Sequence, residues 1–302
     1  MSCRTKLRGT GVAIITPFKR DFSVDYTALE KLIDFIIDNG VGYIVTLGTT
    51  GESPTIDKEE KISIINFTYE KVNGRVPVVV GVGGNNTREA VADLKHLPLK
   101  EATAILSVSP YYSKPSQEGL YLHYKAIAEA APQPVILYNV PGRTGRNLDA
   151  GTVLRLAELP NIAGIKEAGG DMMQCMQILK YRPDDFLVSS GDDALGFPQI
   201  ACGMDGVISV IANCMPHEFS GMVHAALDGR LQEAKAINDT LLDAYQLLFV
   251  ENNPAGVKSF LTHLGLIENV LRLPVTAVSE ALHQKIKQFL QKHSARQGAL
   301  VS

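Results

Sequence analysis

The sequence predicts an α/β fold, a (β/α)₈ TIM barrel over residues 1–230 followed by a C-terminal helical extension over residues 231–302. Three observations support this prediction. Short apolar runs alternate with helical patterns, as in a parallel sheet covered by helices on both faces. Polar motifs follow most of these runs, and the chain turns almost wholly helical after Val210. A length of 302 residues suits one such barrel with extra helices.

Eight apolar, β-branched runs are the predicted strands. Most of them are continuous rather than alternating, which is the pattern of strands buried on both faces. They cover Val12–Thr16, Tyr43–Leu47, Val76–Val82, Thr103–Val108, Val135–Asn139, Ile162–Lys166, Phe186–Ser190 and Gly206–Val210.

Helical periodicity fills the segments between the runs. Apolar residues recur at three- and four-residue spacing from Tyr26 to Ile36, and Gly40 follows as a stop signal. Asp57 and Glu60 predict a capping box at the start of the next helix. Near the C-terminus, one helix closes the barrel and the others form the extension; the helical segments are Pro216–Leu227, Leu231–Val250, Pro254–Leu264 and Thr276–Lys292.

The polar motifs favour a closed barrel over a doubly wound sheet. They follow five different predicted strands, always at the carboxyl end: GTTGES (48–53), SPYYSKP (109–115), NVPGRTG (139–145), Lys166-Glu167 and GDD (191–193). The carboxyl ends of barrel strands meet at one mouth, where catalytic loops lie. A doubly wound sheet would instead concentrate such residues at one switch point.

Composition narrows the function classes. Hydrophobic residues make up 45% and charged residues 20%, the net charge is −3, and the scattered Lys and Arg predict no nucleic-acid partner. No CxxC pair and no His cluster with metal-ligand spacing occurs, so we expect reduced thiols and no metal site. No apolar run approaches a membrane span, and the N-terminal residues do not read as a signal peptide. These features predict a cytoplasmic protein.

Lys166 and Tyr138 are the first candidate catalytic residues. Lys166 ends an apolar run, where burial would favour the neutral amine that attacks a carbonyl. Tyr138 stands 28 positions earlier (166 − 138), one βαβ step, so both side chains could reach one pocket and the phenol could relay protons. Taken singly, a surface lysine and a core tyrosine are the commoner interpretations.

The GTTGES motif predicts a carboxylate cradle. Its glycines permit a tight turn, and Thr49 and Thr50 add hydroxyl donors beside exposed backbone N–H groups. The motif lacks the GK[ST] end of a phosphate-binding loop, and an ordinary glycine-rich turn is the alternative. Arg143, between Gly142 and Gly145, could hold a second carboxylate, although most loop arginines are solvated.

Two further pairs remain ambiguous. Tyr111-Tyr112 could line a pocket or a subunit interface, or simply pack. Asp192-Asp193 could bind Mg²⁺, but a cap for a helix starting at Ala194 is the preferred interpretation.

Together these motifs resemble the dihydrodipicolinate synthase (4-hydroxy-tetrahydrodipicolinate synthase) family, within the N-acetylneuraminate lyase superfamily of pyruvate-dependent class I aldolases. The similarity runs from Gly11 to about Pro274. Its landmarks are GTTGES, SPYYSKPSQEGLYLHY (109–124), YNVPGRTG (138–145), GIKEA (164–168), SGDD (190–193) and GVISVIAN (206–213).

The resemblance implies a lyase of lysine and diaminopimelate biosynthesis that condenses pyruvate with L-aspartate-4-semialdehyde. It needs no cofactor other than the covalent lysine–pyruvate imine, and it forms a homotetramer, a dimer of dimers. The implied catalytic residues are Lys166 for the imine, with Tyr138, Thr49 and the neighbouring subunit's copy of Tyr112 as proton relay. The implied substrate-binding residues are Thr50 for the pyruvate carboxylate, Arg143 for the aldehyde's carboxylate, and the backbones of Gly191 and Ile208 for the pyruvate pocket.

The resemblance also bears on regulation. The positions that match the family's lysine effector site are Ser53, Asn85, Glu89 and Tyr111. Some lysine-sensitive members carry histidines where this chain has Lys58 and Lys61. Added cations beside the effector's ammonium are unfavourable, so we expect weak or absent inhibition by lysine.

Two other functions stay open at this point. A sugar-acid aldolase, such as an N-acetylneuraminate or 2-keto-3-deoxy sugar-acid lyase, would use the same imine; Arg143 and the Thr49-Thr50 pair favour the synthase instead. A non-catalytic small-molecule-binding barrel is the second alternative. The combination of Lys166, Tyr138 and Thr49 argues against it, since a binding protein needs no such set.

Overall fold

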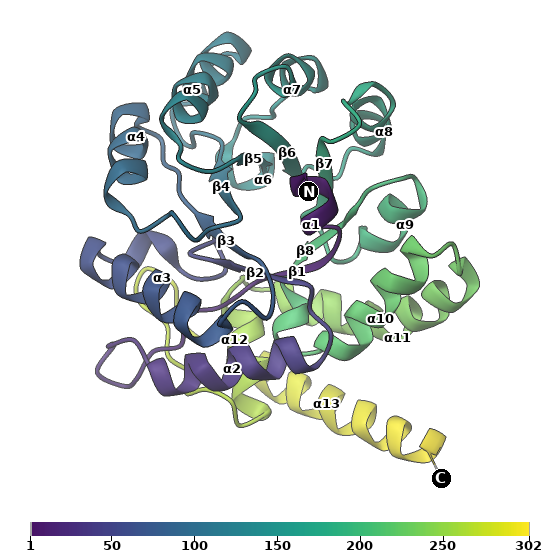
Figure 1. The fold of residues 1–302 in the computed structure, drawn as a ribbon. Coiled ribbons are helices and arrows are strands. Elements are labelled where there is room, and N and C mark those ends of the chain that lie inside the picture. Colours follow the sequence, from purple (N-terminus) through teal and green to yellow (C-terminus); the bar gives the residue numbers. More distant parts are fainter. Residues whose placement is uncertain (1, 302) are drawn as a thin grey trace.

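The computed structural model describes residues 2–301, with side chains described as far as His293. Within that range, eight parallel strands close into a barrel in chain order (Figure 1). They are β1 (Gly9–Ala13), β2 (Tyr43–Thr46), β3 (Val78–Gly81), β4 (Ala104–Val108), β5 (Val135–Asn139), β6 (Ile162–Glu167), β7 (Leu187–Ser190) and β8 (Gly206–Ser209). The predicted fold class is confirmed, and the doubly wound alternative is wrong.

The strand β1 lies three residues earlier than predicted, whereas the other strands agree within two residues at each end. Glycines explain the difference. A Cβ on Gly11 would lie 2.2 Å from the ring of Tyr43, and a Cβ on Gly206 would lie 2.0 Å from the carbonyl oxygen of Gly9. Close contacts with a side chain at Gly11 and with the backbone at Gly206 therefore require glycine, and strands that contain glycine are not recognised as continuous apolar runs.

Helices surround the barrel (Figure 1). They are α1 (Cys3–Lys6), α2 (Tyr26–Asp38), α3 (Lys58–Val72), α4 (Thr87–His96), α5 (Gln117–Ala130), α6 (Pro141–Thr144), α7 (Ala150–Ala157), α8 (Met172–Tyr181), α9 (Gly196–Ala201), α10 (Pro216–Leu227), α11 (Leu231–Phe249), α12 (Ala255–His263) and α13 (Glu280–Val301), with the short helices η1 (Ser53–Thr55) and η2 (Ile211–Asn213). The predicted capping box is confirmed: the Glu60 N–H donates to Asp57 over 2.8 Å, and the Asp57 N–H donates back to the Glu60 carboxylate.

Two apolar layers hold these elements together. A small cluster fills the barrel interior and includes Tyr43, Tyr138 and Ile208. A larger cluster lies between the strands and the surrounding helices. Burial on this scale supplies most of the stability of the fold, at about 25 cal/mol for each Å² of apolar surface removed from water. No helix within the described residues is long and apolar enough to cross a membrane.

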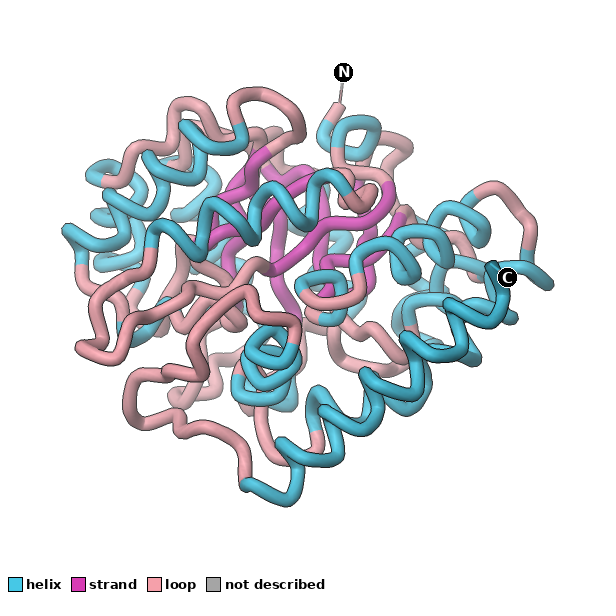
Figure 2. The backbone as a smooth tube through the Cα atoms, turned by 90° about the horizontal axis from the view of Figure 1, so that it is seen from below, coloured by secondary structure: helices cyan, strands magenta, loops and turns pink. Residues whose placement is uncertain are grey.

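The C-terminal helices pack against one side of the barrel. The helix α11 contacts α10 as well as α12 and α13, and Figure 2 shows the last helix running along the outside of the molecule. The start of α13 differs from the prediction because the side chain of Ser279 caps it, accepting from the Leu282 N–H at 3.2 Å. The boundary between a barrel domain ending at residue 230 and an extension starting at residue 231 stays a proposal. The helix α11 begins at Leu231. The last residue of the predicted extension, Ser302, lies outside the described residues.

The aspartate pair after β7 also differs from its prediction. The helix begins at Gly196 rather than Ala194. Asp192 accepts from the N–H groups of Ala194 and Leu195, so it caps the preceding turn. Asp193 is buried and accepts from the backbone N–H groups at the end of β8, where burial raises its pKa to about 6.

Candidate active site

Lys166 and Tyr138 face each other at the carboxyl end of the barrel. They are register partners on β6 and β5, and the Lys166 Nζ lies 4.4 Å from the centroid of the Tyr138 ring. Both are buried, with exposed fractions of 5% and 7%. The barrel thus removes an amine from water and places a phenol beside it, which is the arrangement needed to form an imine and move its protons.

Gly191 determines where the Lys166 side chain can lie. A Cβ at this position would be 2.8 Å from Cε and 3.1 Å from Cγ of Lys166, and 2.7 Å from the Cβ of Ala168. The Gly191 N–H donates to the Glu167 carbonyl at 2.7 Å, which fixes the backbone next to the lysine. Any larger residue would displace the lysine stem.

The GTTGES segment forms a tight turn after β2. Its backbone closes through bonds from the Gly51 N–H to the Gly48 carbonyl and from the Glu52 N–H to the Thr49 carbonyl, both 3.1 Å. Thr49 is half-buried and Thr50 is buried. The Thr50 Oγ1 accepts from the Asn253 side-chain amide at 3.0 Å, so its own hydroxyl hydrogen remains available for an anion.

Beside this turn lies a cavity of about 480 Å³. Thr49, Tyr138 and Arg143 line it together. Arg143 belongs to the short helix α6, and its Nη2 donates to the Asn253 carbonyl at 3.3 Å. The cavity therefore joins a hydroxyl donor, a phenol and a guanidinium, which suits a small substrate carrying carboxylates.

A buried polar network around Glu167, next to Lys166 on β6, is not predicted by the sequence. The Glu167 carboxylate accepts from Asn139 at 3.0 Å, from Gln174 at 3.0 Å and from the Gly169 N–H at 2.6 Å. Burial raises the pKa of Glu167, while these hydrogen bonds oppose the rise. Alternation along β6 places Glu167 opposite Lys166, which was the available signal for a supporting role.

Among the residues that the structure describes, no three His, Cys, Asp or Glu side chains are grouped so that they could hold a metal ion.

A model of the dihydrodipicolinate synthetase family matches residues 6–293. The chain belongs to this family. The 4-hydroxy-tetrahydrodipicolinate synthase of Parabacteroides distasonis is 51% identical over 291 residues, which are 96% of this chain and 98% of that protein. Among solved structures, dihydrodipicolinate synthase from Aquifex aeolicus aligns with a TM-score of 0.92 at 42% identity, covering 95% of this chain and 98% of that one. The chloride-inhibited dihydrodipicolinate synthase from Acinetobacter baumannii, solved with pyruvate, aligns with a TM-score of 0.92 at 43% identity, covering 94% and 98%.

The other positions assigned through the family lie in three different places: exposed on the surface, in the barrel interior, and along the cavity that Tyr138 and Arg143 line. Tyr112 has a left-handed backbone (φ 72°) and is 90% exposed, while Tyr111 is 41% exposed and lines the cavity. Ile208 is buried in the barrel interior. The positions assigned to an effector line the same cavity as Arg143; they are Ser53, Asn85, Glu89 and Tyr111.

Proposed function

We propose that the chain is a 4-hydroxy-tetrahydrodipicolinate synthase that condenses pyruvate with L-aspartate-4-semialdehyde through an imine on Lys166. The observation that carries this proposal is the buried Lys166–Tyr138 pair at the carboxyl end of the barrel. Family membership and the 51% identity to a 4-hydroxy-tetrahydrodipicolinate synthase support the choice of reaction.

The residues suggest a sequence of steps. The Lys166 amine adds to the pyruvate ketone and water leaves, which gives a protonated imine. This electron sink lets the methyl group lose a proton and become an enamine, with Tyr138 and Thr49 moving the protons. The enamine carbon bonds to the aldehyde carbon of the semialdehyde. The amine of that product then attacks the imine carbon, which closes the ring and releases Lys166.

The carboxylates of the two substrates would bind at different points. The Thr50 hydroxyl and the backbone of its turn would hold the pyruvate carboxylate, because the Asn253 amide leaves the hydroxyl hydrogen free to donate. Arg143, which lines the cavity, would hold the carboxylate of the semialdehyde. Gly191 and Ile208 would border the pyruvate through their backbones.

The proposal extends to assembly and location. The exposed Tyr112 would complete the proton relay of a second subunit in a homotetramer built as a dimer of dimers. The chemistry would need no metal or organic cofactor, since the imine itself withdraws electrons. We place the enzyme in the cytoplasm, where pyruvate is available.

Borohydride reduction in the presence of pyruvate, followed by peptide mass mapping, tests the mechanism. The expected result is a pyruvyl adduct on Lys166 and consumption of aspartate semialdehyde in a coupled assay. An adduct on another residue would contradict the mechanism. Cleavage of sialic acid without condensation of the semialdehyde would identify a sugar-acid aldolase, and pyruvate binding without an adduct would identify a binding protein.

A further inference from the structure

The turn that carries Thr49 and Thr50 is conformationally strained at both ends. Leu47, which precedes it, and Glu52, which follows it, both have left-handed backbones with φ of 56° and 55°. A non-glycine residue in this region costs about 1–3 kcal/mol, so it persists only where surrounding contacts hold it. The contacts around Glu52 therefore decide whether the turn keeps its shape.

Glu52 is held by residues from the C-terminal extension. Its carboxylate lies 2.5 Å from the Nζ of Lys258 on α12 and accepts from the main-chain N–H of Arg272 at 3.1 Å. Glu52 is 3% exposed and Lys258 is 0% exposed. A charge buried this deeply and left without its partner would be very unfavourable, so each residue constrains the other.

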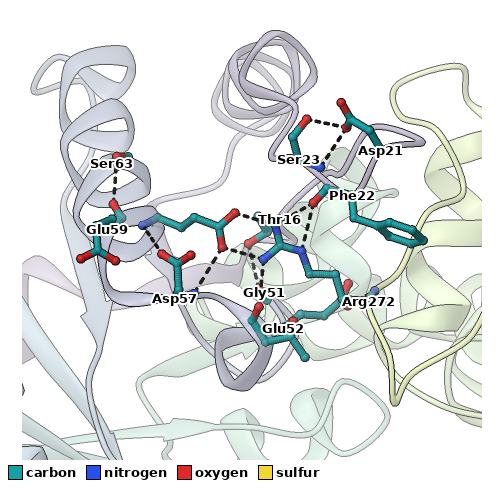
Figure 3. A network of polar contacts seen from close by, with 12 residues as sticks. Thr16, Asp21, Phe22, Ser23, Gly51, Glu52, Asp57, Glu59, Ser63 and Arg272 are labelled. Carbon is teal, nitrogen blue, oxygen red and sulfur yellow. Dashed lines mark hydrogen bonds and ion pairs between the residues drawn. The ribbon is translucent and has the colours of Figure 1, made fainter.

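The charged groups of Lys258 and Arg272 are held by further contacts. The Lys258 Nζ donates to the Val270 carbonyl at 2.9 Å, and the ring of Phe18 lies 4.2 Å from it and 4.3 Å from the Arg272 guanidinium. Arg272 also forms two bonds to the Glu60 carboxylate on α3. Figure 3 shows Arg272 reaching from the C-terminal segment towards Phe22 and the turn at Glu52.

A second contact reaches the same turn two residues earlier. The Asn253 amide donates to the Thr50 hydroxyl at 3.0 Å, and the Asn253 side chain is 5% exposed. The segment from Asn253 to Arg272 thus contacts the turn at Thr50 and at Glu52, on either side of Gly51. Thr16 adds a bond to the Gly51 carbonyl at 2.8 Å.

We propose that Glu52 and Lys258 are positioning residues for pyruvate: their buried ion pair holds the Thr49–Thr50 turn in the shape that receives the pyruvate carboxylate. The inference rests on the proposed function. Neither residue need touch the substrate, because loss of the pair would let the strained Glu52 backbone relax and move Thr50. An error of about 1 Å in such a group is enough to weaken substrate positioning severely.

The protonation of Lys258 supports the same conclusion. Burial lowers the pKa of Lys258 to about 8, against the opposing attraction of Glu52. The groups that face its ammonium are Glu52 from the turn after β2 and Arg272 from the segment after α12, with Glu60 beyond Arg272 on α3. Above pH 8 the ammonium loses its proton and the ion pair is lost. Half-saturation by pyruvate should therefore require more pyruvate as the pH rises through 8.

The test compares Lys258→Met, Glu52→Gln and the double variant, using the full chain. The readout is the pyruvate concentration that gives half-maximal borohydride-trapped adduct on Lys166. We expect about a tenfold increase for Lys258→Met, with the yield of adduct at saturation unchanged. The double variant also lacks the ion pair, so its half-maximal pyruvate concentration should stay raised, and it should lose the dependence near pH 8.

Arg182→Met is the matched control. Arg182 forms a buried ion pair with Asp205 at the other end of the barrel. The Arg182→Met variant should have lower thermal stability, but the pyruvate concentration for half-maximal adduct should not change. A folded Lys258→Met protein with unchanged half-saturation overturns the inference. If the Lys258→Met protein does not fold, Glu52→Gln provides the test. This variant keeps Lys258 and should raise the pyruvate concentration for half-maximal adduct about threefold.

The outcomes also separate the two proposals. If no adduct forms on Lys166 in the unmodified chain, both the proposed function and this inference fall. If the adduct forms but half-saturation is the same in all variants, only this inference falls.

Discussion

At the amino-terminal end of the barrel, Asp205 lies between Arg4 and Arg182; at the carboxyl-terminal end, Glu52 lies between Lys258 and the main chain of Arg272. Both carboxylates are buried. Their further neighbours differ. Asp205 also accepts from the Val188 N–H on β7 at 2.9 Å, so it joins strands. Glu52 ends a turn that lines the cavity through Thr49.

The comparison shows how one type of interaction has two consequences. Removing a charge at the amino end should loosen β7 and β8 at the end of the barrel away from the cavity. Removing one at the carboxyl end should move a turn that borders the cavity. This agrees with the division of a (β/α)₈ barrel into a face that stabilises and a face that reacts.

Replacement of the proposed nucleophile Lys166 should have the largest effect. Lys166→Met should reduce the rate of condensation by about 10³-fold or more and abolish the pyruvyl adduct, since it removes the amine that lies beside Tyr138. Steady-state kinetics and intact mass after borohydride measure both. Lys180→Met, at an exposed lysine on α8, is the control and should retain activity. A trapped adduct in Lys166→Met would contradict the assignment.

Gly191→Ala should have the next largest effect on activity. The added Cβ would come within 2.8 Å of the Lys166 Cε, so the side chain must shift. We expect kcat to fall by about 10²-fold. Gly151→Ala, on α7, meets nothing within 4 Å and should leave kcat unchanged. Equal activity of the two variants would show that the lysine tolerates the displacement.

At the amino-terminal end, Arg182→Met should act on stability. It leaves Asp205 buried with only the partly exposed Arg4 as a charged partner, so the free energy of unfolding should fall by about 3 kcal/mol. Urea denaturation measures this change. Arg4→Met should cost less than about 1 kcal/mol, because the Arg4 side chain is 34% exposed. A change in the KM for pyruvate in Arg182→Met would contradict the view that the amino-terminal end acts on stability alone.

The smallest effect concerns regulation. Lys61 lines the cavity beside Glu89, whereas Lys58 is exposed and lies 3.9 Å from Asp93. A cation at Lys61 disfavours binding of a lysine ammonium, so activity should stay flat up to millimolar lysine. Lys61→His should increase sensitivity modestly at pH 8, and Lys58→His should change it less. Strong inhibition of the unmodified chain would refute this prediction.

The fold could be predicted largely because its signals are local. Continuous apolar runs mark strands buried on both faces, and the Asp57–Glu60 capping box marks a helix start. The strand β1 was misplaced because it contains Gly9, which has a left-handed φ of 114°, and Gly11, whose Cβ would lie 2.2 Å from the distant Tyr43 ring; neither feature is visible in local periodicity. Helix α13 was misplaced because Ser279 caps it.

The candidate site divides in the same way. Lys166, Tyr138 and Thr50 stand in motifs at strand ends, and the structure brings Lys166 and Tyr138 together. The supports of the site carry no such signal. Lys258 stands in an apolar helix and Arg272 in an irregular segment, and they meet Glu52 only through packing across more than 200 positions. Tertiary neighbours, rather than sequence neighbours, define them.

The Asn253–Thr50 bond, which spans 203 positions, also has a consequence for the order of events during synthesis. A ribosome releases the N-terminal part of a chain first, and domains fold as they emerge. The turn at Thr50 and the proposed nucleophile Lys166 are made long before Asn253 and Lys258. An unfinished chain would therefore contain Lys166 while the turn at Thr50 still lacked its contact with Asn253. The affinity for pyruvate would reach its full value only after the C-terminal helices had packed against the barrel. Pyruvate binding would therefore indicate that synthesis of the chain is complete.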